Sequence, residues 1–378
     1  MNFFSGSISA GLAYADVARM SRILERERLT SRERVLTAIS IHQPDRVPIA
    51  LSFYPTALPQ TGGKDADEQL GTDVRFVEFD PPREQDEFLR YLERLPSDVT
   101  VGDLRTLRTY FEWGYHPEKP GTEPLAKART ICEMESFRFP DVLKVPRYRN
   151  LKDRVRKFHA RGLAVAGSPP HLGGEIFETA QRLRGFERLM LDFLRNPELV
   201  DYLFNQLAGV ASESVVILAE AGVDVISLDD DVGEPSRMMI SPHLWRRFSK
   251  PPLARMIRKA REVNPAQRIL YHSDGYIEPI IPDLIEIGVN AINPVQPDVM
   301  DPAKLKEKYG SRLAFWGTVG TASDWTYGPP SEIGAQAKER IENVGAGGGL
   351  VIGPAYDLEP QVKWENVLAL LKAVQKYG

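Results

Sequence analysis

The chain has 378 residues, of which 42% are hydrophobic and 26% charged, a composition typical of a soluble globular protein with a large core. Its formal net charge of −4 gives no general attraction to nucleic acid or to an anionic membrane, and no apolar run approaches the roughly 20 residues that span a bilayer. A single cysteine, Cys132, excludes an internal disulfide and any cysteine-rich metal cage, so we expect a cytoplasmic protein.

The first 29 residues predict an N-terminal helical extension. Apolar positions such as Leu12, Val17 and Ile23 recur near helical spacing, and the segment runs directly into the charged sequence RILERERL, unlike a signal peptide. A second helix is expected after Thr30, because Thr30 and Glu33 have the spacing of a capping box. The first helix would cover one end of the fold or pack against a partner subunit. The second arrangement would make the protein a homodimer.

The sequence RVPIALSFY, at residues 46–54, predicts the first buried strand. Residues 55–146 have no regular period and are rich in proline, glycine and charge. We therefore expect one or two strands there, within a long irregular insertion. The insertion contains a group of aromatic residues, Tyr110, Phe111, Trp113 and Tyr115. Such a group more often packs inside the protein, and substrate contact is the alternative.

After residue 147, short apolar runs alternate with helical segments. The runs are LAVAGSPP, DVISLDDD, RILYHSDG, AINPVQP, LAFWGTVG and GGLVIGPAYD. Repeated strand and helix units predict right-handed parallel connections and an α/β fold. The total of about eight strands favours a (β/α)8 TIM barrel over an open sheet. We expect residues 30–378 to form this barrel, and the absence of a glycine-rich phosphate-binding loop after any run argues against a nucleotide cofactor.

Polar side chains gather at the ends of these runs, where a TIM barrel places its active site. His272 and Asp274 end one run and share a face of the strand, because side chains two positions apart point the same way. The other run ends contribute His171, Asp229, Asp230, Asp231, Glu234, Asn293, Gln296, Trp316, Thr318, Tyr356 and Asp357.

Crowded carboxylates raise one another's pKa or require a cation. One carboxyl group could stay protonated as a general acid, or several oxygens and the neutral nitrogen of His272 could bind a divalent ion. The alternative role is helix capping at loop starts, which suits Asp229 and Asp230 at least as well. For four residues a function is favoured: Asp231, Glu234, His272 and Asp274.

Five blocks carry a resemblance to a known family: SRERVLTAISIHQPDRVPI, LDDDVGEPSRMMISPHLWRRFSKPPLARMI, HSDGYIEPIIPDLIEIGVNAINPVQP, LAFWGTVGT and VIGPAYDLEPQVKWENVLALL. Over most of residues 30–375 the chain resembles the uroporphyrinogen decarboxylase superfamily, whose members are TIM barrels. The first block, HSDG and NPVQP look more like the corrinoid-dependent methyltransferases than the true decarboxylases. Where the decarboxylases carry Arg-Gln-Ala-Gly-Arg to bind porphyrinogen carboxylates, this chain has ALSFYPTAL.

The resemblance implies a methyltransferase that demethylates a methoxylated, possibly aromatic, small molecule. Its relatives hold zinc with a His-x-Cys pair and a further cysteine. Here His272 matches the histidine, whereas Asp274 and Tyr356 stand at or near the two cysteine positions. The implied metal ligands are therefore His272, Asp274 and Glu234, a harder site that does not suit coenzyme M chemistry.

The leaving oxygen would need protonation or polarisation by a metal. The resemblance makes Asp231, Glu234, Asp274 and Tyr356 the catalytic candidates. The residues expected to contact substrate are His171, Asn293, Gln296 and Trp316.

The chain has no Asp-x-His-x-x-Gly motif for binding a corrinoid, so the corrinoid (cobalamin) is expected on a separate partner protein that docks over the barrel mouth. Residues 55–140 would serve that docking or select the substrate. Two alternatives stay open. One is a decarboxylase or other lyase that works without cobalt, and the other is a catalytically silent barrel that binds a ligand or partner.

Overall fold

The computed structural model describes residues 28–51, 66–80, 109–116, 121–140, 143, 145–356, 358–359 and 361–378. Nearly all of the predicted N-terminal extension and much of the predicted insertion lie outside the described residues. Asp357, one of the predicted strand-end residues, lies outside them as well.

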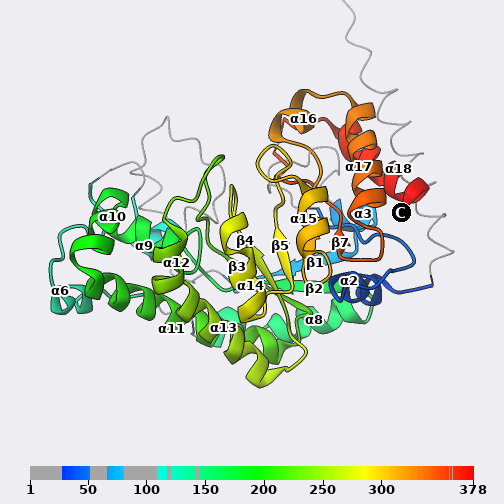
Figure 1. The fold of residues 1–378 in the computed structure, drawn as a ribbon. Helices are drawn as coiled ribbons and strands as arrows, with labels where there is room; N and C mark the ends of the chain where they lie inside the picture. Colours follow the sequence, from blue (N-terminus) through cyan, green and yellow to red (C-terminus); the bar gives the residue numbers. More distant parts are fainter. Residues whose placement is uncertain are drawn as a thin grey trace, which may run out of the picture.

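Seven parallel strands form one sheet in the order in which they occur along the chain (Figure 1). Their bounds are β1 Val74–Val77, β2 Ala164–Gly167, β3 Val225–Asp229, β4 Arg268–His272, β5 Ala291–Asn293, β6 Ala314–Trp316 and β7 Leu350–Val351. The α/β class and the six strands predicted after residue 147 are thereby confirmed. β1 is one of the strands expected inside the irregular region.

The predicted first strand is reduced to a single parallel bridge between Ile49 and Ile352, the residue after β7. On its other side Ile49 faces Asp73, which precedes β1. The Asp73 amide donates to the Ile49 carbonyl at 2.8 Å, and the Ile49 amide donates to Asp73 Oδ2 at 2.8 Å. Residues 48–50 therefore hydrogen-bond to both edges of the seven-stranded sheet.

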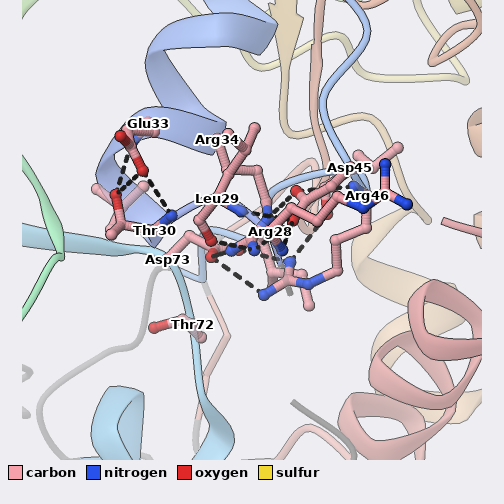
Figure 2. A network of polar contacts seen from close by, with 12 residues as sticks. Arg28, Leu29, Thr30, Glu33, Arg34, Asp45, Arg46, Thr72 and Asp73 are labelled. Carbon is pink, nitrogen blue, oxygen red and sulfur yellow. Dashed lines mark hydrogen bonds and ion pairs between the residues drawn. The ribbon is translucent and has the colours of Figure 1, made fainter. Parts of the chain in front are cut away.

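A buried network of arginine and aspartate side chains surrounds this junction (Figure 2). Arg34 Nη1 donates to Asp73 Oδ1 at 2.6 Å, and Arg34 Nε donates to Asp45 Oδ1 at 2.8 Å. Arg46 Nη1 donates to Asp73 Oδ2 at 2.7 Å. The side chains of Arg34 and Asp73 are fully buried, so loss of either charge would remove one of the two ion-pair partners of the other.

Helices connect the strands and cover the sheet. Their bounds are α2 Ser31–Ile39, α3 Ala66–Leu70, α6 Ile131–Glu135, α7 Val145–Tyr148, α8 Leu151–His159, α9 Phe177–Arg184, α10 Phe186–Arg195, α11 Pro197–Ala221, α12 Pro242–Phe248, α13 Lys250–Val263, η3 Glu278–Ile280, α14 Ile281–Ile287, α15 Pro302–Tyr309, α16 Ala322–Tyr327, α17 Pro330–Asn343 and α18 Trp364–Tyr377. The capping box of Thr30 and Glu33 at the start of α2 is confirmed.

The strands divide their side chains between two apolar clusters. One face, with Val165, Ile226 and Ile269, packs with the helices in the larger cluster. The other face, with Val225 and Leu270, packs in the smaller cluster, to which α2 contributes Val35 and Ile39. This alternation follows from the two-residue period of a strand, and it fixes which strand-end residues face inward.

The helix α11 corrects one expectation from the sequence. By length and composition it is long and apolar enough to cross a membrane, although no such run was expected. However, 56% of its most apolar window is buried inside the protein, and it lies against α8 and α13 (Figure 1). Its apolar side chains are thus used in the core, as in Leu203 and Phe204.

The aromatic group in the insertion serves mainly as packing. Trp113 is buried and its ring lies edge-on to Phe139, with 6.5 Å between the centroids. Tyr110 and Tyr115 are in edge-on contact at 5.2 Å. Tyr110 also carries the Arg182 guanidinium 5.7 Å above its ring, which connects this group to α9.

Candidate functional site

A cavity of about 430 Å³ lies at the carboxyl ends of the strands. Its polar lining includes the last residues of three neighbouring strands, Asp229 of β3, His272 of β4 and Asn293 of β5. Aromatic side chains form part of the wall, and the rings of Phe76 and Trp316 lie 6.4 Å apart. Further lining comes from Leu51, Ser227, Asp274, Pro294, Trp325, Thr326, Pro354, Tyr356, Glu359 and Val362.

Asp229, Asp231 and His272 form the tightest group of potential metal ligands among the described residues. His272 Nε2 lies 3.9 Å from Asp229 Oδ1 and 3.8 Å from Asp231 Oδ1. All three side chains are half-buried. Asp229, for which capping seemed equally suitable, therefore lines the cavity together with His272, and Asp231 lies beside them.

Asn293 determines which nitrogen of His272 faces these carboxylates. Asn293 Nδ2 donates to the Trp316 carbonyl at 3.1 Å, which leaves Oδ1 as an acceptor 2.6 Å from His272 Nδ1. This network assigns the hydrogen to Nδ1, so the lone pair or a second proton is on Nε2. Metal-binding histidines are oriented by hydrogen bonds of this kind.

The charges of the cluster demand a positive partner. Burial alone would lower the pKa of His272, but the carboxylates of Asp229, Asp231 and Asp274 outweigh it and raise the pKa to about 9. Burial raises the pKa of Asp229 well above its ordinary value, and Asp231 adds to this while His272 opposes it. Either a proton on His272 or a bound cation can neutralise the group.

Asp274 lines the same cavity but is held by its own partners. Gln296 Nε2 donates to Asp274 Oδ1 at 2.9 Å, and the Asp274 amide donates to Asp231 Oδ1 at 2.7 Å. Gln296 is buried and also accepts from the Gly275 amide at 2.8 Å. The structure thus places Gln296 behind Asp274, where it orients the carboxylate.

Gly275 allows the turn after β4 to approach the chain after β3. Its φ of 79° is in the left-handed region, and a Cβ there would lie 2.4 Å from the backbone carbon of Gly233. A larger residue would separate the two turns that carry Asp231 and Asp274.

Glu234 lies apart from the cluster. Its carboxylate pairs with Arg237 at 2.8 Å near the surface, and its side chain is 36% exposed. It does not line the cavity and does not belong to the ligand group. The structure therefore does not bring Glu234 together with His272 and Asp274.

Tyr356 and His171 approach the site from two further directions. The Tyr356 hydroxyl lies 3.2 Å from Asp298 Oδ1, and burial together with Asp298 raises the pKa of Tyr356 above its ordinary value. His171 Nε2 lies 4.0 Å from Asp229 Oδ2. Burial, with Arg182 in addition, lowers the pKa of His171 to about 4, so this imidazole is neutral at pH 7.

Asp230 has the capping role that the sequence analysis considered. Its carboxylate accepts from the amides of Phe177 and Glu178, at 2.9 and 3.0 Å, at the start of α9. Burial raises its pKa to about 7, although these two hydrogen bonds oppose the shift. Asp229 and Asp230 therefore point to opposite sides of β3 and have different roles.

The sequence analysis missed two charged residues beside the mouth, Glu178 and Arg182. They pair with each other on α9, and burial raises the pKa of Glu178, with Asp231 adding to the shift. In the sequence they are ordinary members of a helical segment. Only the contact of α9 with the end of β3 reveals their position.

Comparison with known proteins shows the family to which the chain belongs. Residues 129–377 match the family model for uroporphyrinogen decarboxylase (URO-D). The methylcobamide:CoM methyltransferase MtaA of Methanosarcina barkeri is 29% identical over 179 residues, which are 46% of this chain and 49% of that protein, so the match spans about half the relative's length. A uroporphyrinogen decarboxylase of Xanthomonas axonopodis pv. citri is 24% identical over 368 residues, covering 91% of this chain and 98% of that protein.

Among solved structures, a methyltransferase from Methanosarcina mazei has the same fold. Its TM-score is 0.64 at 22% sequence identity, with 93% of this chain and 99% of that chain covered. Because the family model matches well over half of the residues, the chain belongs to the uroporphyrinogen decarboxylase (URO-D) family.

Proposed function

We propose that this protein is a corrinoid-dependent methyltransferase that removes the methyl group from a methoxylated small molecule and passes it to a separate corrinoid protein. The observation that carries the proposal is the group of Asp229, Asp231 and His272, of which Asp229 and His272 line a partly aromatic cavity. The partial match to MtaA supports the reaction class. The cytoplasmic location and the homodimer stay predictions.

The fold that best suits this function is a closed (β/α)8 barrel with residues 47–51 as the eighth strand. Its support is the set of hydrogen bonds from residues 48–50 to Ile352 on one side and Asp73 on the other. Closure would place the ends of all eight strands around one mouth, where a substrate meets side chains from several strands.

The ligand group fits a divalent ion such as zinc. It offers one imidazole nitrogen and two carboxylate oxygens, a suitable set for a borderline or hard cation. Its separations of 3.8 and 3.9 Å are slightly wider than the roughly 3.3 Å between tetrahedral ligands at zinc. When bound, zinc would act as a Lewis acid toward the leaving oxygen. We therefore propose Asp229, Asp231 and His272 as ligands, replacing the expected set of His272, Asp274 and Glu234.

Proton donation falls to the residues around this group. An ether oxygen leaves poorly as an anion, so a positioned acid accelerates its departure. The raised pKa of Tyr356 keeps its hydroxyl protonated, and Tyr356 is one of the residues that line the cavity. Asp274 lines it too, with Oδ1 fixed by Gln296. We propose Tyr356 as the donor and Asp274 as the group that orients the substrate.

The test combines the purified protein with a reduced Co(I) corrinoid protein and a panel of methoxylated aromatic compounds. The expected result is methyl-cobalt absorbance with at least one compound, and its loss in His272→Ala and Asp229→Asn. Asp153→Asn, on the exposed side of α8, is the matched control and should retain the signal. No methyl-cobalt signal across the panel would refute the proposed substrate class.

Decarboxylation without cobalt is the second candidate, because the match to uroporphyrinogen decarboxylase covers 91% of this chain, against 46% for MtaA. Against it, no arginine or lysine is among the described residues that line the cavity, whereas a polycarboxylate substrate calls for cations. Consumption of uroporphyrinogen by the protein would favour this candidate. A silent ligand-binding barrel would turn over neither substrate.

A further inference from the structure

The position of Asp229 depends on a residue that belongs to neither the cavity wall nor the ligand group. β2 pairs with β3 only at Ala166 with Val225 and at Gly167 with Ile226. Beyond this point, the edge of β3 that faces β2 has no strand to accept its amides. A backbone amide buried without an acceptor is unfavourable, so another group must take over.

Glu175, in the loop between β2 and α9, takes over both hydrogen bonds. Its amide donates to the Asp229 carbonyl at 2.7 Å, and its Oε2 accepts from the Asp229 amide. One residue therefore holds the backbone of Asp229 at both polar groups. The preceding Gly174 permits this approach, because a Cβ there would lie 2.8 Å from the Asp229 carbonyl oxygen.

A carboxyl group is a costly choice for this role. Glu175 is only 4% exposed, and burial, together with Asp229 and Asp230, raises its pKa well above its ordinary value. Its second oxygen, Oε1, has no hydrogen-bond partner. A buried polar atom without a partner destabilises the fold, so Glu175 is placed at a cost that packing alone does not explain.

Behind Glu175, beneath α12 and α13, lies a packing gap that has no room for a water molecule. Trp245, Ser249 and Tyr271 line it together with Glu175. Trp245 Nε1 and Ser249 Oγ are buried and have no partner, as is true of Glu175 Oε1. Ser249 lines the same gap but makes no hydrogen bond to Asp229. A substitution of Ser249 is therefore a control for changes in local packing that leave the Asp229 backbone untouched.

We propose that Glu175 is a positioning residue that fixes the backbone of Asp229 and so directs the Asp229 carboxylate toward His272 and Asp231. This inference rests on the proposed function, in which Asp229 serves the reaction as a ligand. Glu175 itself touches neither substrate nor ion.

The experiment compares Glu175→Ala, Glu175→Gln and Ser249→Ala in the full-length protein. The first readout is Zn²⁺ affinity by competition with a chelator. The second is hydrogen exchange of the backbone in a peptide covering residues 225–231. We expect Glu175→Ala to weaken Zn²⁺ binding by about tenfold or more, as is usual for residues that orient ligands, and to speed exchange in this peptide but not in one covering β6.

The conservative variant distinguishes positioning from general packing. Glu175→Gln keeps an oxygen that accepts from the Asp229 amide, so Zn²⁺ affinity and exchange should stay within about threefold of wild type, a difference at the lower end of one hydrogen bond's usual effect. Ser249→Ala should change only the melting temperature. If Glu175→Ala does not fold, Glu175→Asp, with a shorter reach, should show the same losses.

Wild-type Zn²⁺ affinity and wild-type exchange in the Glu175→Ala protein would overturn the inference. The outcome for Glu175 can be separated from that for the proposed function. If the wild-type protein binds no Zn²⁺, the proposed metal site is refuted. The hydrogen exchange of residues 225–231 then still tests whether Glu175 positions Asp229. Faster exchange in Glu175→Ala, but not in Glu175→Gln or Ser249→Ala, supports the positioning role. Unchanged exchange in Glu175→Ala refutes it.

Discussion

Asn293 Oδ1 lies 2.6 Å from Nδ1 of His272 and thereby aims the opposite nitrogen of the imidazole at Asp229 and Asp231. This contact follows from the register of the sheet, in which His272 of β4 is directly beside Asn293 of β5. No sequence motif links these two residues, and the alignment of β4 with β5 is what pairs them. The same pairing makes Asn293 a sensitive position for testing the site.

Replacing Asn293 with alanine should weaken Zn²⁺ binding. The imidazole loses the hydrogen bond that fixes its ring and its tautomer, and such losses usually cost about 10–100-fold in metal affinity. Chelator competition measures the change. Asn205→Ala, at an exposed position on α11, should bind Zn²⁺ like the wild type, and equal affinities in both variants would contradict the role of Asn293.

Zn²⁺ affinity should rise with pH. The ion must displace the proton of His272, whose pKa is raised to about 9, so affinity should increase by about tenfold for each pH unit between 7 and 9 and then level off. Titrations at fixed ionic strength give this slope. A flat profile would mean that His272 does not bind the ion through its titrating nitrogen.

The free energy of unfolding of the metal-free protein should show the opposite trend. Because the pKa of His272 is higher in the folded state than its ordinary value of 6.5, its protonation stabilises the fold fully below pH 6.5. That contribution is lost as pH rises from 6.5 through 9. Allowing for partial exposure, the loss should be about 2 kcal/mol. Urea unfolding of wild type and His272→Ala tests this, since the variant should lack the decline.

Asp73→Asn should destabilise the protein strongly. The change removes the buried carboxylate that Arg34 and Arg46 share and leaves Arg34 with Asp45 as its acidic partner. Removing one partner of a buried ion pair costs up to about 3–5 kcal/mol. Urea unfolding measures the difference. Asp153→Asn breaks an exposed pair with Arg156, which should cost less than about 1 kcal/mol. Similar losses in both would show that burial of the Arg34 network matters little.

Gly275→Ala should distort the turn that carries Asp274. Left-handed backbone costs an alanine about 1–2 kcal/mol, and the methyl group would also meet the Gly233 backbone at 2.4 Å. We expect a lower melting temperature and weaker Zn²⁺ binding together. Gly209→Ala is the control, because a Cβ there has no neighbour within 4 Å and alanine favours the helix by about 1 kcal/mol.

The parallel sheet could be predicted because its strands are short apolar runs that end in polar residues. The orientation of His272 and Asp274 followed from the two-residue period alone. Among the described residues of the predicted first strand, Ile49 makes one bridge, and on its other side it pairs with the backbone amide and the side chain of Asp73. No sequence period shows that an aspartate will substitute for a strand.

The composition of the site was harder to predict. Asp229 and Asp230 are adjacent and chemically identical, so only the pairing of β3 decides which one caps α9 and which faces the cavity. Glu234 seemed suitable because it follows closely in sequence, but the turn at Gly233 directs it to Arg237. Glu175 carried no signal, because its partner Asp229 is distant in the chain.

The bridge between Ile49 and Ile352 has a consequence for how the chain folds. It joins two segments that are far apart in the sequence, so a growing polypeptide cannot form it until Ile352 has been synthesised. Until then the side of residues 48–50 that faces away from Asp73 has no strand beside it, which is the kind of edge on which chains aggregate. A protein truncated before β7 would keep that edge permanently, and its solubility rather than its activity would be the first property to fail.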